Sequence, residues 1–245
     1  MKIAHIIHTL QPNEGSDLID AQPMTFESMI EAKQYALKRN PYNTIELLAT
    51  VYEEDMHLIP DGFVQTKDLD DNLSNHIQAR KLPFIKDILD RCYDYDPDYL
   101  IYTNVDIALT ESFYTKVKSY IDLGHDAVII NRTTMPSYEG QTLDWFLQNI
   151  KSGMQHPGYD CFVIKKDLYE KMNLGKIVIG VNWIGEILLR NIFRYAENPV
   201  ILQRPYMTFH MGDDRVWNDP KHITERNWNQ IQAQTIISKF NNDGK

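Results

Sequence analysis

Apolar positions along this chain follow two spacings, one typical of helices and one typical of buried strands. Residues 25–41 (TFESMIEAKQYALKRNP) place apolar side chains on one side of a helix, with Thr25 as a candidate N-cap and Pro41 after the last turn. The stretches on either side, residues 1–10 and 44–52, are short and apolar, as buried strands are. A strand, a helix and a second strand in this order predict a parallel sheet.

The same pattern continues through the rest of the chain. Further helices are predicted at residues 82–97, 112–123 and 182–193, and further strands at 99–103, 127–131, 161–165 and 200–204. The stretches without clear periodicity are 11–22, 60–79, 132–140, 151–159 and 209–221. Long loops of this kind in a compact α/β domain usually carry function.

The length of the chain bounds its domain organisation. At 245 residues it can bury one large core, and it contains neither an internal repeat nor a Gly/Ser-rich linker. We therefore expect residues 1–245 to form a single domain. The tail from about Asn227 to Lys245 is polar, and we expect it to fray.

Composition excludes several classes of function. The formal net charge of −9 argues against nucleic acid as a partner, because such proteins neutralise phosphates with Lys and Arg. No window approaches the roughly 18 uninterrupted apolar residues of a transmembrane helix. Cys92 and Cys161 are the only cysteines and offer neither a disulfide framework nor a C-x-x-C site. A reducing, cytoplasmic location suits this chain.

A pair of polar residues stands where a predicted strand ends. In LIYTNVDIAL, residues 100–109, the side chains of Asn104 and Asp106 share one side if the backbone is still extended, so their oxygens can reach one hard cation. Such an ion can bridge the two phosphates of a nucleotide. This acidic chain has no Gly-rich loop that could bind the phosphates through backbone N–H groups instead. The alternative is structural, because Asn and Asp also cap turns.

Residues 80–109 resemble the GT-A class of nucleotide-sugar glycosyltransferases, in which a helix leads into a strand that ends in a D-x-D motif. Here the motif reads NVD. The resemblance implies an α/β fold, a GT-A-like, Rossmann-type mixed sheet flanked by helices. It also implies Mn²⁺ or Mg²⁺ as cofactor, held by Asp106, with Asn104 as a weaker ligand or a contact to the ribose. His210 in MTFHMGDDRVW is the matching third ligand, and Arg215 can pair with a phosphate.

The same resemblance places the donor nucleotide at the ends of the first two strands and at the start of the helix before NVD. The candidate residues for this role are His8, Thr9, Leu10, Tyr52, Asp55 and Arg80. An acidic group that accepts from a base N–H and an Arg that binds a phosphate are the expected chemistry. The alternative is that these charges form a solvated rim.

A second dense group of polar residues occupies QHPGYDCFVIKK, residues 155–166. Transfer to a hydroxyl with inversion needs a general base within hydrogen-bond reach. Asp160 is the first candidate, followed by His156 and Glu186. Asp160 can instead close an Asx-turn onto its own backbone.

These observations predict a glycosyltransferase that uses a nucleotide-sugar donor and a glycan or other hydroxyl acceptor, and they leave the oligomeric state open. A sugar-nucleotide nucleotidyltransferase is one alternative. Such enzymes carry Gly-rich, basic residues after the first strand, whereas HTLQPNEGSD has one Gly and no Lys or Arg. The other alternative is a non-catalytic nucleotide- or sugar-binding protein, which Asn in place of the first Asp favours.

Overall fold

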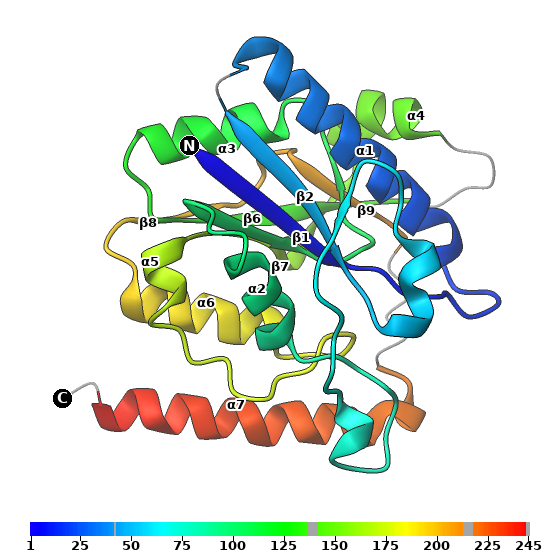
Figure 1. Ribbon diagram of the computed structural model, residues 1–245, viewed down its shortest axis with the longest axis vertical. Helices are drawn as coiled ribbons and strands as arrows, with labels where there is room; N and C mark the ends of the chain where they lie inside the picture. Colours follow the sequence, from blue (N-terminus) through cyan, green and yellow to red (C-terminus); the bar gives the residue numbers. More distant parts are fainter. Residues whose placement is uncertain (42, 137–141, 213–217, 244–245) are drawn as a thin grey trace.

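A computed structural model describes residues 1–41, 43–136, 142–212 and 218–243. Within them, nine strands form one sheet in the order β3-β2-β1-β4-β7-β6-β9-β5, with β8 paired to β6 (Figure 1). The strands are β1 (Lys2–His8), β2 (Thr44–Thr50), β3 (Val64–Gln65), β4 (Tyr99–Thr103), β5 (Ala108–Leu109), β6 (Ala127–Met135), β7 (Met154–Lys165), β8 (Pro199–Leu202) and β9 (Thr208–Met211).

The sheet is mixed. Strand β1 pairs in parallel with β2 and β4, so the predicted parallel arrangement is confirmed for these three strands. Strand β7 runs antiparallel between β4 and β6, with Thr103 opposite Cys161. Because β1, β2 and β4 run the same way, the residues that follow them meet at one edge of the sheet, where ligands bind in open α/β folds.

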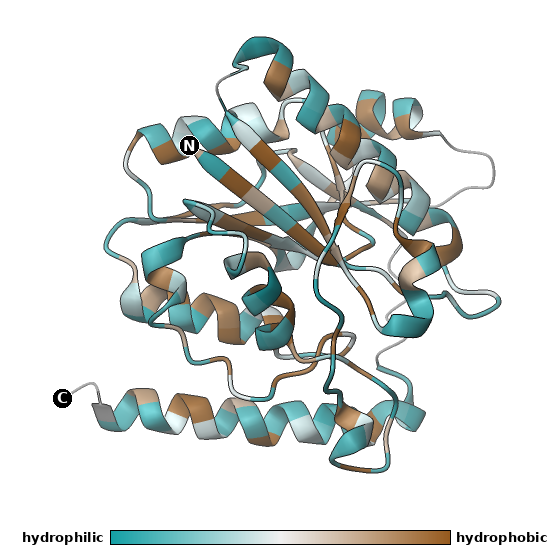
Figure 2. Ribbon diagram, in the orientation of Figure 1, coloured by the Kyte–Doolittle hydropathy of each residue, from teal (hydrophilic) through white to brown (hydrophobic). Residues whose placement is uncertain are grey.

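Helices cover both faces of the sheet. In Figure 1, α1 (Leu18–Arg39), α3 (Phe113–Asp122) and α4 (Leu143–Asn149) lie on one side, and α2 (Ile85–Tyr93), α5 (Lys166–Tyr169), α6 (Ile184–Tyr195) and α7 (Ile223–Asp243) lie on the other. Strand β1 contributes to both cores, because Ile3 and Ile7 pack with α1 and α3 while Ala4 and Ile6 pack with α2 and α6. Figure 2 accordingly shows hydrophobic residues along the central strands.

Several boundaries differ from the sequence-based prediction. Helix α1 begins at Leu18 rather than near Thr25, although Pro23 lies inside it. The early start is supported by Gln22, whose side chain accepts from the N–H of Leu10 and donates to its carbonyl oxygen. Strands β6 and β7 extend beyond the predicted segments to Met135 and back to Met154, because they pair with each other around a bulge.

The expectation that the tail from Asn227 frays is wrong for residues 227–243, which belong to helix α7. Ala233 and Ile236 are buried in the same core as α2 and α6. The helix has few apolar residues, and much of its attachment is polar. Asn229, fully buried, accepts from the N–H of Val178 and donates to its carbonyl oxygen, each at 2.9 Å. No helix of the described residues is long and apolar enough to cross a bilayer.

A buried histidine lies in the middle of the sheet. His5 on β1 hydrogen-bonds with Tyr114 through Nδ1 at 2.8 Å and with Thr103 through Nε2 at 3.0 Å. Burial lowers the pKa of His5 to about 3 and that of His8, at the end of the same strand, to about 4. Both rings are therefore neutral in the folded protein at ordinary pH.

The attachment of α7 predicts unequal effects of two substitutions on the same helix. Ile236 is 2% exposed and Ile231 is 60% exposed. Ile236→Ala leaves a cavity and should lower the free energy of unfolding by about 2–5 kcal/mol. Ile231→Ala is the matched control and should change it by less than about 0.5 kcal/mol. Urea unfolding measures both, and equal small effects would mean that α7 is not docked.

The neutral histidines predict acid sensitivity. The unfolded chain binds protons at these rings near the ordinary pKa of about 6.5, whereas the folded chain does not, so stability is full above that pH and falls below it. Each histidine should remove about 1.4 kcal/mol per pH unit until the folded pKa is approached. In urea unfolding between about pH 7.5 and 5.5, His5→Gln should flatten this dependence. A variant that loses stability equally at every pH would contradict the assignment.

Candidate active site

The candidate site begins where β4 ends. All five residues of β4 are buried, and after Thr103 the chain turns, closed by the N–H of Ile107 donating to the carbonyl oxygen of Asn104 at 3.2 Å. Asp106 lies within this turn, just before the short strand β5. The polar residues predicted to bind a ligand therefore occupy the edge of the sheet to which β1 and β2 also lead.

Asp106 and His210 are brought together by strand pairing. Strand β5 runs antiparallel to β9, with Ala108 opposite Phe209. This register places Asp106, two residues before Ala108, beside His210, one residue after Phe209. The Oδ2 atom of Asp106 lies 3.1 Å from Nε2 of His210. The two residues that the resemblance suggests as ligands of one metal ion thus lie in contact.

The hydrogen bonds of His210 require either a proton on Nε2 or a cation beside it. Its Nδ1 lies 2.8 Å from the carbonyl oxygen of Gly212, which can only accept, so Nδ1 carries a proton. In the neutral ring, Nε2 then presents a lone pair to the Asp106 carboxylate. Such a contact is favourable only when Nε2 is protonated or when a metal ion stands between the two groups, as for a histidine ligand oriented by a backbone carbonyl.

Charges around this pair shift both pKa values. Burial by itself would lower the pKa of His210, but the neighbouring carboxylate of Asp106 outweighs it and the pKa is raised. Burial would raise the pKa of Asp106, but His210 and then Arg132 lower it below its ordinary value. Asp106 is therefore held as a carboxylate. Its second oxygen, Oδ1, is buried and has no hydrogen-bond partner among the described residues.

A second group of polar side chains lies on β6 and β7. Arg132 is 8% exposed, and its Nη1 lies 3.3 Å from Oδ2 of Asp160 while its Nη2 lies 3.2 Å from Nδ1 of His156. The bulge between these strands is held by Asn131, which donates to the carbonyl oxygens of His156 and Gly158. Because a guanidinium only donates, Nδ1 of His156 accepts, and the ring proton is on Nε2.

The two groups adjoin. Strand β7 pairs with β4 so that Tyr102 faces Phe162 and Thr103 faces Cys161, which brings Asp160 beside the turn that follows β4. The pKa of Tyr102 is raised, first by burial and then by the negative charges of Asp106 and Asp160, so both carboxylates are near it. Arg132 acts electrostatically on Asp106 and pairs with Asp160. The arrangement combines two carboxylates, two imidazoles and one guanidinium.

Asn104 is engaged differently from Asp106. Its Oδ1 accepts a hydrogen bond of 2.8 Å from the hydroxyl of Tyr102. This hydrogen bond fixes the Asn104 side chain against Tyr102 at the end of β4, and it occupies one lone pair of the Asn104 amide oxygen. Among the described residues no three His, Cys, Asp or Glu side chains come together at one point. Asp106 and His210 are a carboxylate and an imidazole in direct contact, both with the donor chemistry of a metal ligand, whereas Asp160 and His156 each contact Arg132.

The candidates at the ends of β1 and β2 are mostly buried. His8 is 5% exposed, hydrogen-bonds through Nδ1 with the carbonyl oxygen of Thr50, and packs edge-on against Tyr52. Thr9 is fully buried, and its hydroxyl has no partner among the described residues, nor has that of Tyr52. Leu10 is held through its backbone by Gln22. These residues pack at the edge of the site, and His8, Thr9 and Tyr52 present little polar surface to a ligand.

The remaining candidates are spread more widely. Asp55 lies in the helical turn Glu53–Leu58 after β2, and its pKa is raised, first by burial. Arg80 pairs with Glu225 on α7, with 3.0 Å between Nε and Oε1. Glu186, in the first turn of α6, is 41% exposed and pairs with Arg190 on its own helix. Arg215 lies outside the described residues.

Two residues of this region were not found from the sequence. The sequence predicts a loop at Arg132, whereas the structure places this residue in β6. The available signal is a charged residue directly after the apolar run AVIIN, since an Arg buried there needs an acidic partner. Glu225 lies 145 residues from its partner Arg80, and no local pattern indicates that contact.

Comparison with known proteins yields structural similarity only. No protein-family model matches the chain, and neither does any curated protein. Residues 1–349 of TarS from S. aureus, in complex with UDP-GlcNAc, superpose with a TM-score of 0.53 at 9% identity, covering 87% of this chain and 59% of that one. A second structure of TarS 1–349 gives a TM-score of 0.54 at 10% identity, over 86% and 60%. The chain thus spans about three fifths of the TarS segment it matches.

The similarity covers most of the described sheet and helices. At this level of identity it speaks for the fold and not for the reaction. The chain therefore has a GT-A-type fold, the α/β architecture of nucleotide-sugar transferases.

Proposed function

We propose that this protein is a glycosyltransferase that moves a sugar from a nucleoside-diphosphate sugar to a hydroxyl group of a glycan or other acceptor. The observation that carries the proposal is the contact between Asp106 and His210 at the end of β4, beside the Arg132–Asp160 pair. TarS, which shares the fold, was crystallised with UDP-GlcNAc, and this supports a nucleotide-sugar donor here.

The residues at Asp106 fit a divalent ion. A carboxylate oxygen and an imidazole nitrogen 3.1 Å apart are close enough to share one ion, and Oδ1 of Asp106 is a buried oxygen in need of a partner. Asp106 and His210 would hold Mn²⁺ or Mg²⁺, with donor phosphates, water or Asn104 as the other ligands. Bound there, the ion would neutralise negative charge on the departing diphosphate. The protein's part is to keep Asp106 ionised and to orient His210 through Gly212.

The geometry ranks the three candidates for the general base. His156 accepts from Arg132 through Nδ1, so its Nε2 is a donor and has no lone pair for a proton. Glu186 is paired with Arg190 at the surface. Asp160 is one-fifth exposed and forms an ion pair with Arg132 through Oδ2, so its Oδ1 atom would take the proton of the acceptor hydroxyl. This role assumes transfer with inversion.

Substitution of Asp106 tests the donor site. UDP-, GDP- and CDP-sugars are screened by thermal shift with and without Mn²⁺, and each protein is compared with its own ligand-free melting temperature. One donor should stabilise the wild type by about 2.7 kcal/mol at a hundredfold excess over Kd. Asp106→Asn should lose the Mn²⁺-dependent part, whereas Asp122→Asn, which alters an exposed pair with Lys118, should retain it.

Two results would contradict this proposal. One is that none of the nucleotide sugars shifts the wild type. The other is that Asp106→Asn responds as the wild type does. Donor binding that is the same with and without Mn²⁺ would favour a non-catalytic binding protein with this fold.

Substitution of Asp160 tests the base. Asp160→Asn keeps an oxygen facing Arg132 but cannot take a proton, so kcat should fall about 10²- to 10⁴-fold with the donor KM little changed. Asp167→Asn alters a comparable carboxylate in an exposed pair with Lys165 and should leave kcat unchanged. Initial rates of donor consumption with a hydroxyl acceptor give both parameters. If Asp160→Asn retains full kcat, transfer does not use this residue as base.

A further inference from the structure

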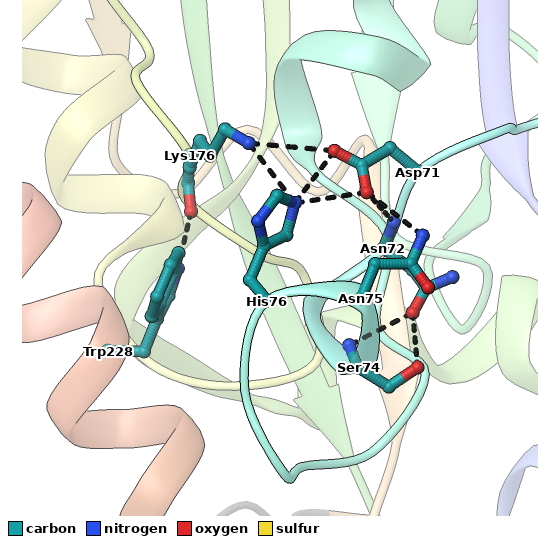
Figure 3. Close-up of polar contacts among 7 residues, drawn as sticks. All are labelled: Asp71, Asn72, Ser74, Asn75, His76, Lys176 and Trp228. Carbon is teal, nitrogen blue, oxygen red and sulfur yellow. Dashed lines mark hydrogen bonds and ion pairs between the residues drawn. The ribbon is translucent and has the colours of Figure 1, made fainter.

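Helix α7 attaches to the segment of chain between α5 and α6. The indole Nε1 of Trp228 donates to the carbonyl oxygen of Lys176 at 2.8 Å, as Figure 3 shows. The next residue, Asn229, bonds to both backbone groups of Val178 and donates to the carbonyl oxygen of Asn182. The first half of α7 is thereby fixed against this segment by side chains that each have a specific backbone partner.

The same half of α7 also meets the segment between β3 and α2, which carries Arg80. In Figure 3, His76 points between Asp71 and Lys176, with Nε2 2.9 Å from Oδ2 of Asp71 and 3.1 Å from Nζ of Lys176. The ring of His76 lies 6.2 Å from that of Trp228, centroid to centroid. The segment before α2, the segment before α6 and the helix α7 thus form one connected assembly.

At the start of α7, Glu225 fixes the backbone and the side chain of Arg80 together. Its Oε1 accepts from Nε of Arg80 at 3.0 Å and from the backbone N–H of Arg80 at 3.3 Å. Glu225 is 3% exposed, so water hardly competes for this carboxylate. The pKa of Glu225 is below its ordinary value, because Arg80 and backbone N–H groups outweigh the effect of burial.

One nitrogen of the Arg80 guanidinium, Nη2, is buried and has no hydrogen-bond partner among the described residues, whereas the Arg80 side chain as a whole is 38% exposed. A charged donor nitrogen in such a position calls for an acceptor, and an anionic phosphate oxygen is the acceptor that Arg binds best. The neighbouring Lys81 lies over the ring of Tyr52 at 3.9 Å, which places this part of the chain beside the end of β2.

We infer that Glu225 is a positioning residue that holds Arg80 ready to bind a phosphate group of the donor, so that helix α7 is part of the donor-binding apparatus. The inference rests on the proposed function, since it takes a nucleoside diphosphate as ligand. Arg has many rotamers, and a side chain already held by Glu225 loses less freedom when the donor binds. Without Glu225, Arg80 would have to be ordered by the donor itself.

The test compares substitutions on the same helix, using the UDP-, GDP- or CDP-sugar that shifts the wild type most. Glu225→Ala should raise the donor KM and Kd about tenfold, with kcat at saturating donor within about twofold. Glu225→Gln, which can keep an oxygen facing Arg80, should recover most of the affinity. Gln232→Ala is the matched control, because Gln232 accepts from the N–H of Lys176 and is not part of the Arg80 contact. It should leave KM unchanged at a similar melting temperature.

A double-mutant cycle separates positioning from general destabilisation. Arg80→Ala should weaken donor binding at least as much as Glu225→Ala, and in that background Glu225→Ala should have no further effect on Kd. If the two effects add, Glu225 does not act through Arg80. If Glu225→Ala does not fold, Glu225→Gln takes its place in the cycle: its small increase in Kd should disappear in the Arg80→Ala background, and an increase that persists there would overturn the inference.

The two proposals fail in different ways. If no nucleotide sugar binds the wild type, the proposed function fails and this inference fails with it. If the wild type binds a donor and Glu225→Ala binds it equally well, the proposed function stands and only the role of Glu225 is overturned.

Discussion

The pairing of β5 with β9 is the constraint on which the candidate site depends. Strand β5 is only two residues long, yet its register against β9 brings Asp106 to His210 across 104 residues of sequence. A shift of one residue in a strand turns its side chains to the opposite face. The contact between Asp106 and His210 therefore depends on this short pairing. Strand β9 is in turn held by its pairing with β6 on its other side.

Much of the fold could be predicted from the sequence because its central strands are buried on both faces. Apolar runs such as YLIYT are hard to place anywhere but inside a sheet, and the polar residues after them mark the edge where the strands end. Asp106 is predicted as a candidate in this way, from one strand and the turn after it. His210 was found through resemblance to a family, since a single histidine after an apolar stretch has no distinctive local signal.

What could not be predicted depends on polar contacts between distant segments. Helix α7 has many Asn and Gln residues and few apolar ones, so its sequence resembles a solvated tail. Its attachment uses Asn229 and Trp228, whose partners are backbone groups that no pattern specifies. Arg132 was missed for a related reason, because the bulge at Asn131 extends β6 past the apolar run that indicated the strand.

The distance along the chain between Arg80 and Glu225 has a consequence for biosynthesis. A polypeptide grows from its amino end, so Arg80 and all nine strands of the described sheet leave the ribosome before α7 does. During that interval the guanidinium lacks its carboxylate, and the nascent chain cannot yet present it in a fixed orientation. Translation of α7 is then the step that supplies the carboxylate partner of Arg80.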